Sequence, residues 1–207
     1  MPRFLKIEDV EVNARLRPFS LDRQILIDGI RMAVAAYGGC TDNDPPSARG
    51  YEPWRATTRG LRELLPSRGY ERDDSGNFST IKHVKHGIRI VVLNTDSKTG
   101  DPRLEIFPRN RLKKGILHER AIGAPDWLPG LPNPFATAQL DIWYLCQHIN
   151  DDKVLAELSR PDRIEDGFIT SWRERILLLK PGDWKTLEAG DRDDDSGPEI
   201  EVDVQLR

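Results

Sequence analysis

Three carboxylates follow an apolar, β-branched stretch of the chain, Ile88–Leu93, which we expect to be a buried strand. They are Asp96, Asp101 and Glu105. Spaced acids at the end of a strand can hold a divalent metal, and a nearby lysine can stabilise charge on a phosphate. One alternative function is therefore a metal-dependent nuclease. Two observations argue against a nuclease. Phe107 stands two residues after Glu105, where a nuclease motif would have a lysine. Asp, Ser, Thr and Gly, which are frequent after the strand, are ordinary turn formers.

A strongly basic run, here called the basic segment (residues 103–120), overlaps these acids. Its cations are Arg103, Arg109, Arg111, Lys113, Lys114 and Arg120. The planar fork of arginine binds phosphate with two hydrogen bonds, and Phe107 could stack on a base. The pattern predicts binding of nucleic acid or another polyanion, and the alternative is a solvated loop. The segment lacks an RNP sequence, a zinc-finger pattern and a clear recognition helix.

The C-terminal end of the chain is strongly acidic. Residues 188–203 contain eight acidic side chains and one basic side chain, so this stretch carries −7 and the rest of the chain +4. We expect a flexible tail over residues 188–207, disordered from Asp191, that either solubilises the protein or masks a basic surface. Alternating apolar residues after Glu199 could add a strand to a sheet edge. The tail or that strand would then serve a protein–protein interaction module, a second alternative function.

Other candidate ligands and nucleophiles are weak. His83 and His86 are three residues apart, which in a strand places them on opposite faces and argues against a shared metal. The remaining candidates are isolated in the sequence: His118, His148, Cys40 and Cys146. Cys146 lies in an apolar stretch, where a buried, inert thiol is expected. No P-loop, GxGxxG, GxSxG or HExxH motif is present. We therefore expect no catalytic residues and no cofactor.

Composition sets the class of protein. The 207 residues are 38% hydrophobic and 31% charged, and the mean hydropathy is −0.57. No apolar run is long enough to span a membrane, and charges interrupt the N-terminus where a signal peptide has its apolar core. Two cysteines far apart suit a reducing compartment. We expect a cytoplasmic protein with one domain over residues 1–187.

Hydrophobic periodicity predicts helices near the N-terminus and strands after them. A helix is expected over Leu21–Tyr37, capped by Ser20, and a second over Trp54–Leu65. Residues 69–94 read as an antiparallel meander of three strands. The pattern as a whole predicts an α+β fold, with a mostly antiparallel sheet packed by N-terminal helices.

The second half of the chain is harder to assign. Pro102–Pro134 holds six of the fifteen prolines and reads as a long irregular excursion, with a short helix at Asn133–Leu140. Ile142–Ile149 and Val154–Leu158 are expected to form a hairpin whose first strand is central. Glu165–Leu179 has a helical stripe, although its last five residues suit a strand equally well. Tryptophans in these periodic stretches, Trp143 and Trp172, are expected in the core.

Several short segments resemble a group of bacterial and prophage-encoded proteins whose function is not established. They are IVVLNTDSKTGDPR (90–103), RNRLKKG (109–115), ELSRP (157–161), WRERI (172–176) and the closing DDDSGPEIEVDVQLR. The resemblance covers roughly residues 60–207 and supplies no catalytic residues. It implies a mobile-element or prophage setting. The leading hypothesis from the sequence is a non-enzymatic cytoplasmic accessory protein that binds nucleic acid through the basic segment.

Overall fold

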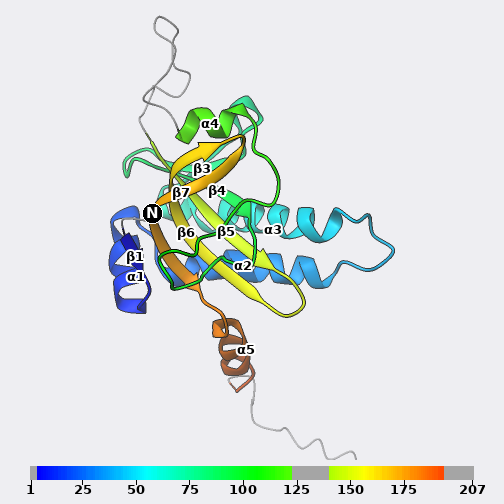
Figure 1. The fold of residues 1–207 in the computed structure, drawn as a ribbon. Coiled ribbons are helices and arrows are strands. Elements are labelled where there is room, and N and C mark those ends of the chain that lie inside the picture. Colours follow the sequence, from blue (N-terminus) through cyan, green and yellow to red (C-terminus); the bar gives the residue numbers. More distant parts are fainter. Residues whose placement is uncertain (1–3, 123–139, 194–207) are drawn as a thin grey trace, which may run out of the picture.

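One mixed sheet of seven strands organises the computed structural model, which describes residues 4–122 and 140–193 (Figure 1). The strand order within the described residues is β1-β7-β6-β5-β4-β3-β2. The strands are β1 (Phe4–Lys6), β2 (Glu71–Asp73), β3 (Thr80–His83), β4 (Ile88–Asn94), β5 (Asp141–Ile149), β6 (Val154–Glu165) and β7 (Phe168–Leu179). The predicted α+β class with a mostly antiparallel sheet is confirmed.

Five α-helices and three short 3-10 turns accompany the sheet in the described residues. The helices are α1 (Asp9–Leu16), α2 (Arg23–Gly38), α3 (Ala48–Leu64), α4 (Ile116–Ile122) and α5 (Asp183–Asp193), and the 3-10 turns are η1 (Arg17–Phe19), η2 (Pro66–Arg68) and η3 (Ser75–Asn77). None of these described helices has the length and apolar content needed to cross a bilayer.

The position of the basic segment follows from one parallel strand pair. Strands β2, β3 and β4 form the predicted meander, and β5, β6 and β7 pair antiparallel to one another. The two groups meet where β4 and β5 run parallel, in register from Ile88–Asp141 to Asn94–Gln147. Parallel neighbours need a long crossover connection rather than a hairpin. Residues 95–140 are that crossover, which explains the long irregular excursion, and the basic segment lies within it.

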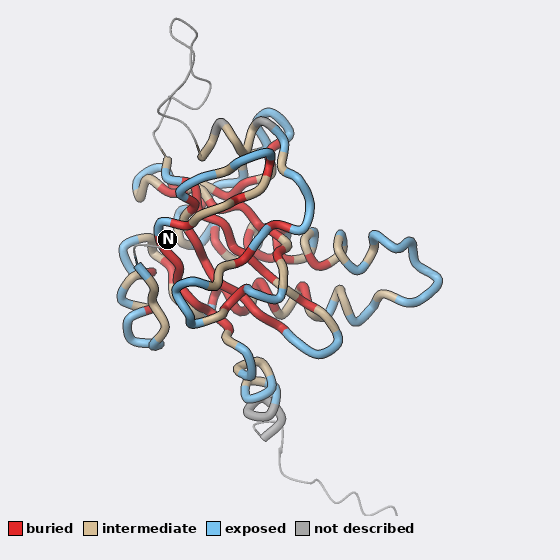
Figure 2. The backbone as a smooth tube through the Cα atoms, in the orientation of Figure 1, coloured by how far each residue is buried: buried red, intermediate tan, exposed pale blue. Residues whose placement is uncertain are grey.

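The sheet is covered on both faces, which accounts for its uninterrupted apolar strands. Alternate residues of β4 and β5, such as Ile90 and Trp143, enter a core shared with α1, α2 and α3. Their neighbours, such as Val91 and Tyr144, enter a second core that includes Leu117 of α4. Buried backbone accordingly concentrates in the central strands (Figure 2). Trp143 and Trp172 are both fully buried, as predicted.

The predicted N-terminal helices exist, but their starts differ from the sequence prediction. Asp22, not Ser20, caps α2, because Asp22 Oδ1 accepts a hydrogen bond from the amide of Ile25 at 2.8 Å. Ser20 instead ends η1 with a left-handed backbone, φ 58°. Helix α3 begins six residues before the predicted start and contains Pro53 in its second turn.

The helical prediction for Glu165–Leu179 is wrong, since Phe168–Leu179 is strand β7. Its pairing with β6 has several register shifts, and its last four residues are all buried. Both features remove the strict alternation expected of a half-buried strand. Apolar residues spaced three and four apart then imitate a helix.

Helix α5 follows β7 and reaches further than the predicted domain boundary. Trp184 and Leu187 of α5 pack against the larger core. Asp191 and Asp193 belong to this helix, so the predicted disorder from Asp191 is wrong for its last turn. The rest of the acidic tail, the expected terminal strand and most of the short helix expected at Asn133–Leu140 lie outside the described residues.

Candidate functional site

A fully buried ion pair fastens the first part of the crossover to the sheet. Arg175 of β7 and Glu157 of β6 have no exposed side-chain surface, and Arg175 Nε donates to Glu157 Oε1 at 2.8 Å. Glu157 Oε2 also accepts from the amide of Gly100 at 2.8 Å. Arg175 donates further to the carbonyls of Asp101 and Ile106. Buried charges are tolerated when all their polar groups are satisfied, and here the crossover backbone satisfies them.

A second buried anchor holds the crossover at Asn110. Its Nδ2 donates to the carbonyl of Gly167 at 2.9 Å, and its Oδ1 accepts from the amide of Ile169 at 2.9 Å. Nearby, Trp172 Nε1 donates to the carbonyl of Pro108 at 3.0 Å. Residues 108–110 are therefore fixed on strand β7 and on the turn before it.

Three of the six predicted cations are exposed on this anchored backbone. Arg109 and Arg111 flank buried Asn110, and Lys113 follows them. Within the described part of the chain none of the three forms an ion pair. Lys113 Nζ lies 6.0 Å from the centre of the Phe168 ring, a cation–π distance. Their charges are available to a ligand.

The structure does not show the other three predicted cations as exposed charges free of ion pairs. Arg103 forms an ion pair with Asp101, with Nη2 and Oδ2 2.7 Å apart. Lys114 is half-buried, and burial lowers the pKa of its amine. The side chain of Arg120 lies outside the described atoms. The structure therefore narrows the predicted binding set to Arg109, Arg111 and Lys113.

The exposed cations continue toward the N-terminal end of α3. Arg111 and Arg49 line one shallow crevice at the ends of parallel strands β4 and β5, together with His148. Arg49 lies 3.5 and 3.6 Å from the carboxylates of Asp42 and Asp151, both strongly exposed. Exposed pairs of this kind contribute little and are screened by salt. Arg49 therefore lies beside the three free cations, but two carboxylates share its charge and it also donates to the Tyr37 hydroxyl.

The carboxylates predicted for a nuclease have turn-forming roles. Asp96 Oδ1 accepts from the backbone amides of Lys98 and Arg109, and Asp101 pairs with Arg103. Glu105 is exposed. Among the described residues, no three His, Cys, Asp or Glu side chains are grouped to hold a metal. The clustering of Asp96, Asp101 and Glu105 that the nuclease alternative requires is thus not found.

The prediction that His83 and His86 point to opposite faces is wrong. Their ring centres are 3.9 Å apart, because His86 lies in the turn after β3 and folds back over His83. His86 Nε2 lies 2.8 Å from Ser20 Oγ, and the His83 ring meets the edge of Tyr70. Burial and the neighbouring His83 and Lys85 lower the pKa of His86. The pair ties the meander to the turn before α2.

Three titratable groups, His118, Tyr144 and Cys146, lie in or against the second core. His118 Nδ1 lies 2.8 Å from the hydroxyl of Tyr144, and its ring packs against Phe78. Burial, with a smaller effect of Lys114, lowers the pKa of His118 to about 4. Burial raises the pKa values of Tyr144 and Cys146. Cys146 is fully buried, which agrees with an inert thiol.

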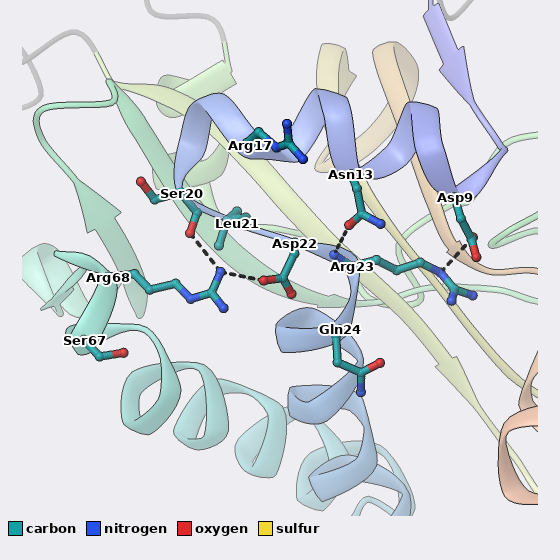
Figure 3. A pocket seen from close by; sticks show the side chains of 10 residues that line it. All are labelled: Asp9, Asn13, Arg17, Ser20, Leu21, Asp22, Arg23, Gln24, Ser67 and Arg68. Carbon is teal, nitrogen blue, oxygen red and sulfur yellow. Dashed lines mark hydrogen bonds and ion pairs between the residues drawn. The ribbon is translucent and has the colours of Figure 1, made fainter. Parts of the chain in front are cut away.

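Sequence reasoning missed a polar cavity of about 960 Å³ between α1, η1, the start of α2 and η2 (Figure 3). Three arginines from different elements line it: Arg17, Arg23 and Arg68. Arg68 lies 2.8 Å from a carboxylate oxygen of Asp22. Arg17, Arg23 and Arg68 are dispersed in the sequence, so no local charge run marks the cavity.

Comparison with family models, with curated proteins and with solved structures found no match to this chain. Proposals about function therefore rest on the residues and geometry described above.

Proposed function

We propose that this chain binds nucleic acid through the phosphate backbone, using Arg109, Arg111 and Lys113 as its central contacts. The observation that carries the proposal is that these three cations are exposed and free of ion pairs within the described residues, on backbone fixed by buried hydrogen bonds. A site held in place before binding loses less conformational freedom when the ligand arrives. Arginine and lysine contacts to phosphate are the main source of affinity for nucleic acids.

Shape and chemistry favour contact with the backbone over sequence readout. The described part of the crossover, residues 95–122, forms an irregular surface, and its one described helix, α4, has seven residues and packs into the second core. A groove-reading protein normally places a helix or a β-ribbon in the major groove. Leu112, 75% exposed between Arg111 and Lys113, could contact a base or sugar. We therefore propose single strands as the preferred ligand and weak dependence on sequence.

The acidic tail enters the proposal as a competitor. Its sequence carries charge opposite to that of Arg109, Arg111 and Lys113, so it would lower the affinity for nucleic acid by occupying the same surface. The resemblance to prophage-encoded proteins implies a mobile-element setting, and we propose a non-enzymatic, cytoplasmic accessory role for the chain. Removing residues 194–207 leaves α5 intact and should tighten binding. Unchanged affinity would reject the masking role while leaving the binding proposal in place.

Titration of a fluorescein-labelled single strand, followed by fluorescence anisotropy, tests the proposal. Replacing Arg109, Arg111 and Lys113 together by Gln should weaken binding and make the plot of log affinity against log salt shallower by about 2, since each lost contact to a single strand removes about 0.7. A matched triple variant replaces Arg55, Arg59 and Arg72, which are exposed and ion-paired elsewhere. The control makes the same change in net charge and should keep the original slope.

A further inference from the structure

The polar cavity beside α1 has donors that the fold leaves unused. Arg17 is exposed, and among the described residues its side chain has no hydrogen bond or ion pair. The side chain of Arg68 contacts the carbonyl of Ser20 and the carboxylate of Asp22 through Nη1. Its Nε and Nη2 therefore remain without a described partner. A guanidinium carries five donors in a fixed fork, so most donors of these two lining side chains have no described partner.

The remaining contacts of the wall hold it in shape (Figure 3). Arg23 Nε donates to the carbonyl of Leu178 at 2.8 Å, and Arg23 N donates to Asn13 Oδ1 at 2.9 Å. Asp22 caps the amide of Ile25. The first amides of α2 thus already have partners, and the case for a ligand rests on the arginine side chains rather than on the helix terminus.

The lining also limits what the ligand can be. Apart from Leu21 every lining residue is polar or charged, and no aromatic ring is among them. A nucleobase would find nothing to stack on, and a lipid chain would find little apolar surface. Asp9 and Asp22 already lie beside Arg23 and Arg68, so the charge of Arg17 is unmatched. A compact, hydrophilic anion fits this balance.

We propose that this cavity binds phosphate, either as the free ion or as a monoester of a small polar molecule, with Arg17 and Arg68 as its main ligands. The fork geometry of each guanidinium matches two phosphate oxygens. The cavity volume of about 960 Å³ leaves room for the polar group that carries the phosphate. This site is independent of Arg109, Arg111 and Lys113, which contact nucleic acid in the function proposed above.

Isothermal titration calorimetry of the full chain tests the site, with inorganic phosphate, glucose 6-phosphate and glucose at matched ionic strength. We expect a dissociation constant of about 1 mM or tighter for at least one phosphate. Tighter binding of the ester than of the free ion would identify an ester as the ligand, and equal binding would identify phosphate itself. Glucose alone should not bind. No binding of either phosphate up to about 10 mM would overturn the proposal.

Matched variants separate this site from other sources of phosphate binding. Arg17→Gln changes an exposed side chain without a described partner and should weaken binding about tenfold or more, the loss expected for charge-assisted hydrogen bonds. Arg59→Gln, on the exposed face of α3, should leave it unchanged. Equal affinities of the Arg17 and Arg59 variants would overturn the assignment. The triple Gln variant at Arg109, Arg111 and Lys113 should keep phosphate binding, so either proposal can fail alone.

Discussion

Replacing Arg175 by Met should destabilise the protein by about 3–5 kcal/mol, the usual cost of removing one partner from a buried ion pair. The structure supports this range because Arg175 and Glu157 both have 0% exposed side chains, so the variant leaves a carboxylate buried without its cation. The carbonyls of Asp101 and Ile106 lose their donor as well. A typical domain has 5–15 kcal/mol of stability, so the variant should still fold and remain measurable.

Urea unfolding followed by tryptophan fluorescence gives the free energy of each variant. Arg173→Met is the matched control, because Arg173 lies on the same strand in an exposed pair with Asp162 and should cost about 1 kcal/mol or less. Adding Glu157→Gln to Arg175→Met should cost less than the sum of the two single changes, since the second removes the stranded charge. A loss below about 1 kcal/mol for Arg175→Met, or one equal to the control, would refute the buried anchor.

Three further predictions concern groups buried around the crossover. The pKa of His118 is about 4 in the folded protein and 6.5 in the unfolded chain, so the neutral ring contributes up to about 3 kcal/mol to the free energy of unfolding. This contribution is present above pH 6.5 and is lost as the pH falls toward 4. His118→Gln should flatten this part of a stability–pH curve, and an unchanged curve would contradict the prediction. Gly100→Ala should destabilise the protein by about 1–3 kcal/mol more than Gly87→Ala in urea unfolding. Both glycines have positive φ, but only at Gly100 would a Cβ collide with a carbonyl oxygen, that of Leu179 in β7; equal losses would argue against this close approach. In the native protein a thiol reagent should modify half-exposed Cys40 and spare buried Cys146, and rapid reaction of both would disprove the burial.

Hydrophobic periodicity is sufficient to predict the helices and strands whose burial is uniform along their length. Strand β4 and the hairpin of β5 and β6 were predicted because their residues are buried along most of their length. Helix α2 was predicted from one apolar stripe. Strand β7 was mistaken for a helix because its environment changes along its length, from a hairpin with register shifts to a strand buried on both faces.

The candidate sites are also only partly predictable from the sequence. The basic segment can be recognised because six cations fall within residues 103–120, but the sequence does not say which of them are free of ion pairs. That distinction depends on partners such as Asp101 for Arg103, and on the burial of Lys114. Glu157 and Arg175 are 18 residues apart and each looks like a solvated charge on a strand. Glu157 is a single acid in an apolar stretch, which is a local signal of burial, whereas Arg175 directly follows the charged residues Arg173 and Glu174.

The contact of His83 with His86 illustrates a further limit. Strand periodicity predicts opposite faces for His83 and His86 only if both residues lie in one strand. Strand β3 ends at His83, and the turn reverses the chain before His86. The polar cavity near Arg17 and Arg68 has no sequence signal because its wall combines residues 9–24 with residues 67–68, which are distant in the chain. Such sites depend on tertiary packing rather than on spacing.

The most direct test of the central claim is the salt dependence of single-strand binding by the full chain and by the triple Gln variant at Arg109, Arg111 and Lys113. We predict measurable binding by the full chain at about 50 mM salt and a slope shallower by about 2 in the variant. Absence of binding at low salt, with or without residues 194–207, would contradict the proposed function. An unchanged slope in the triple variant would show that other residues contact the phosphates.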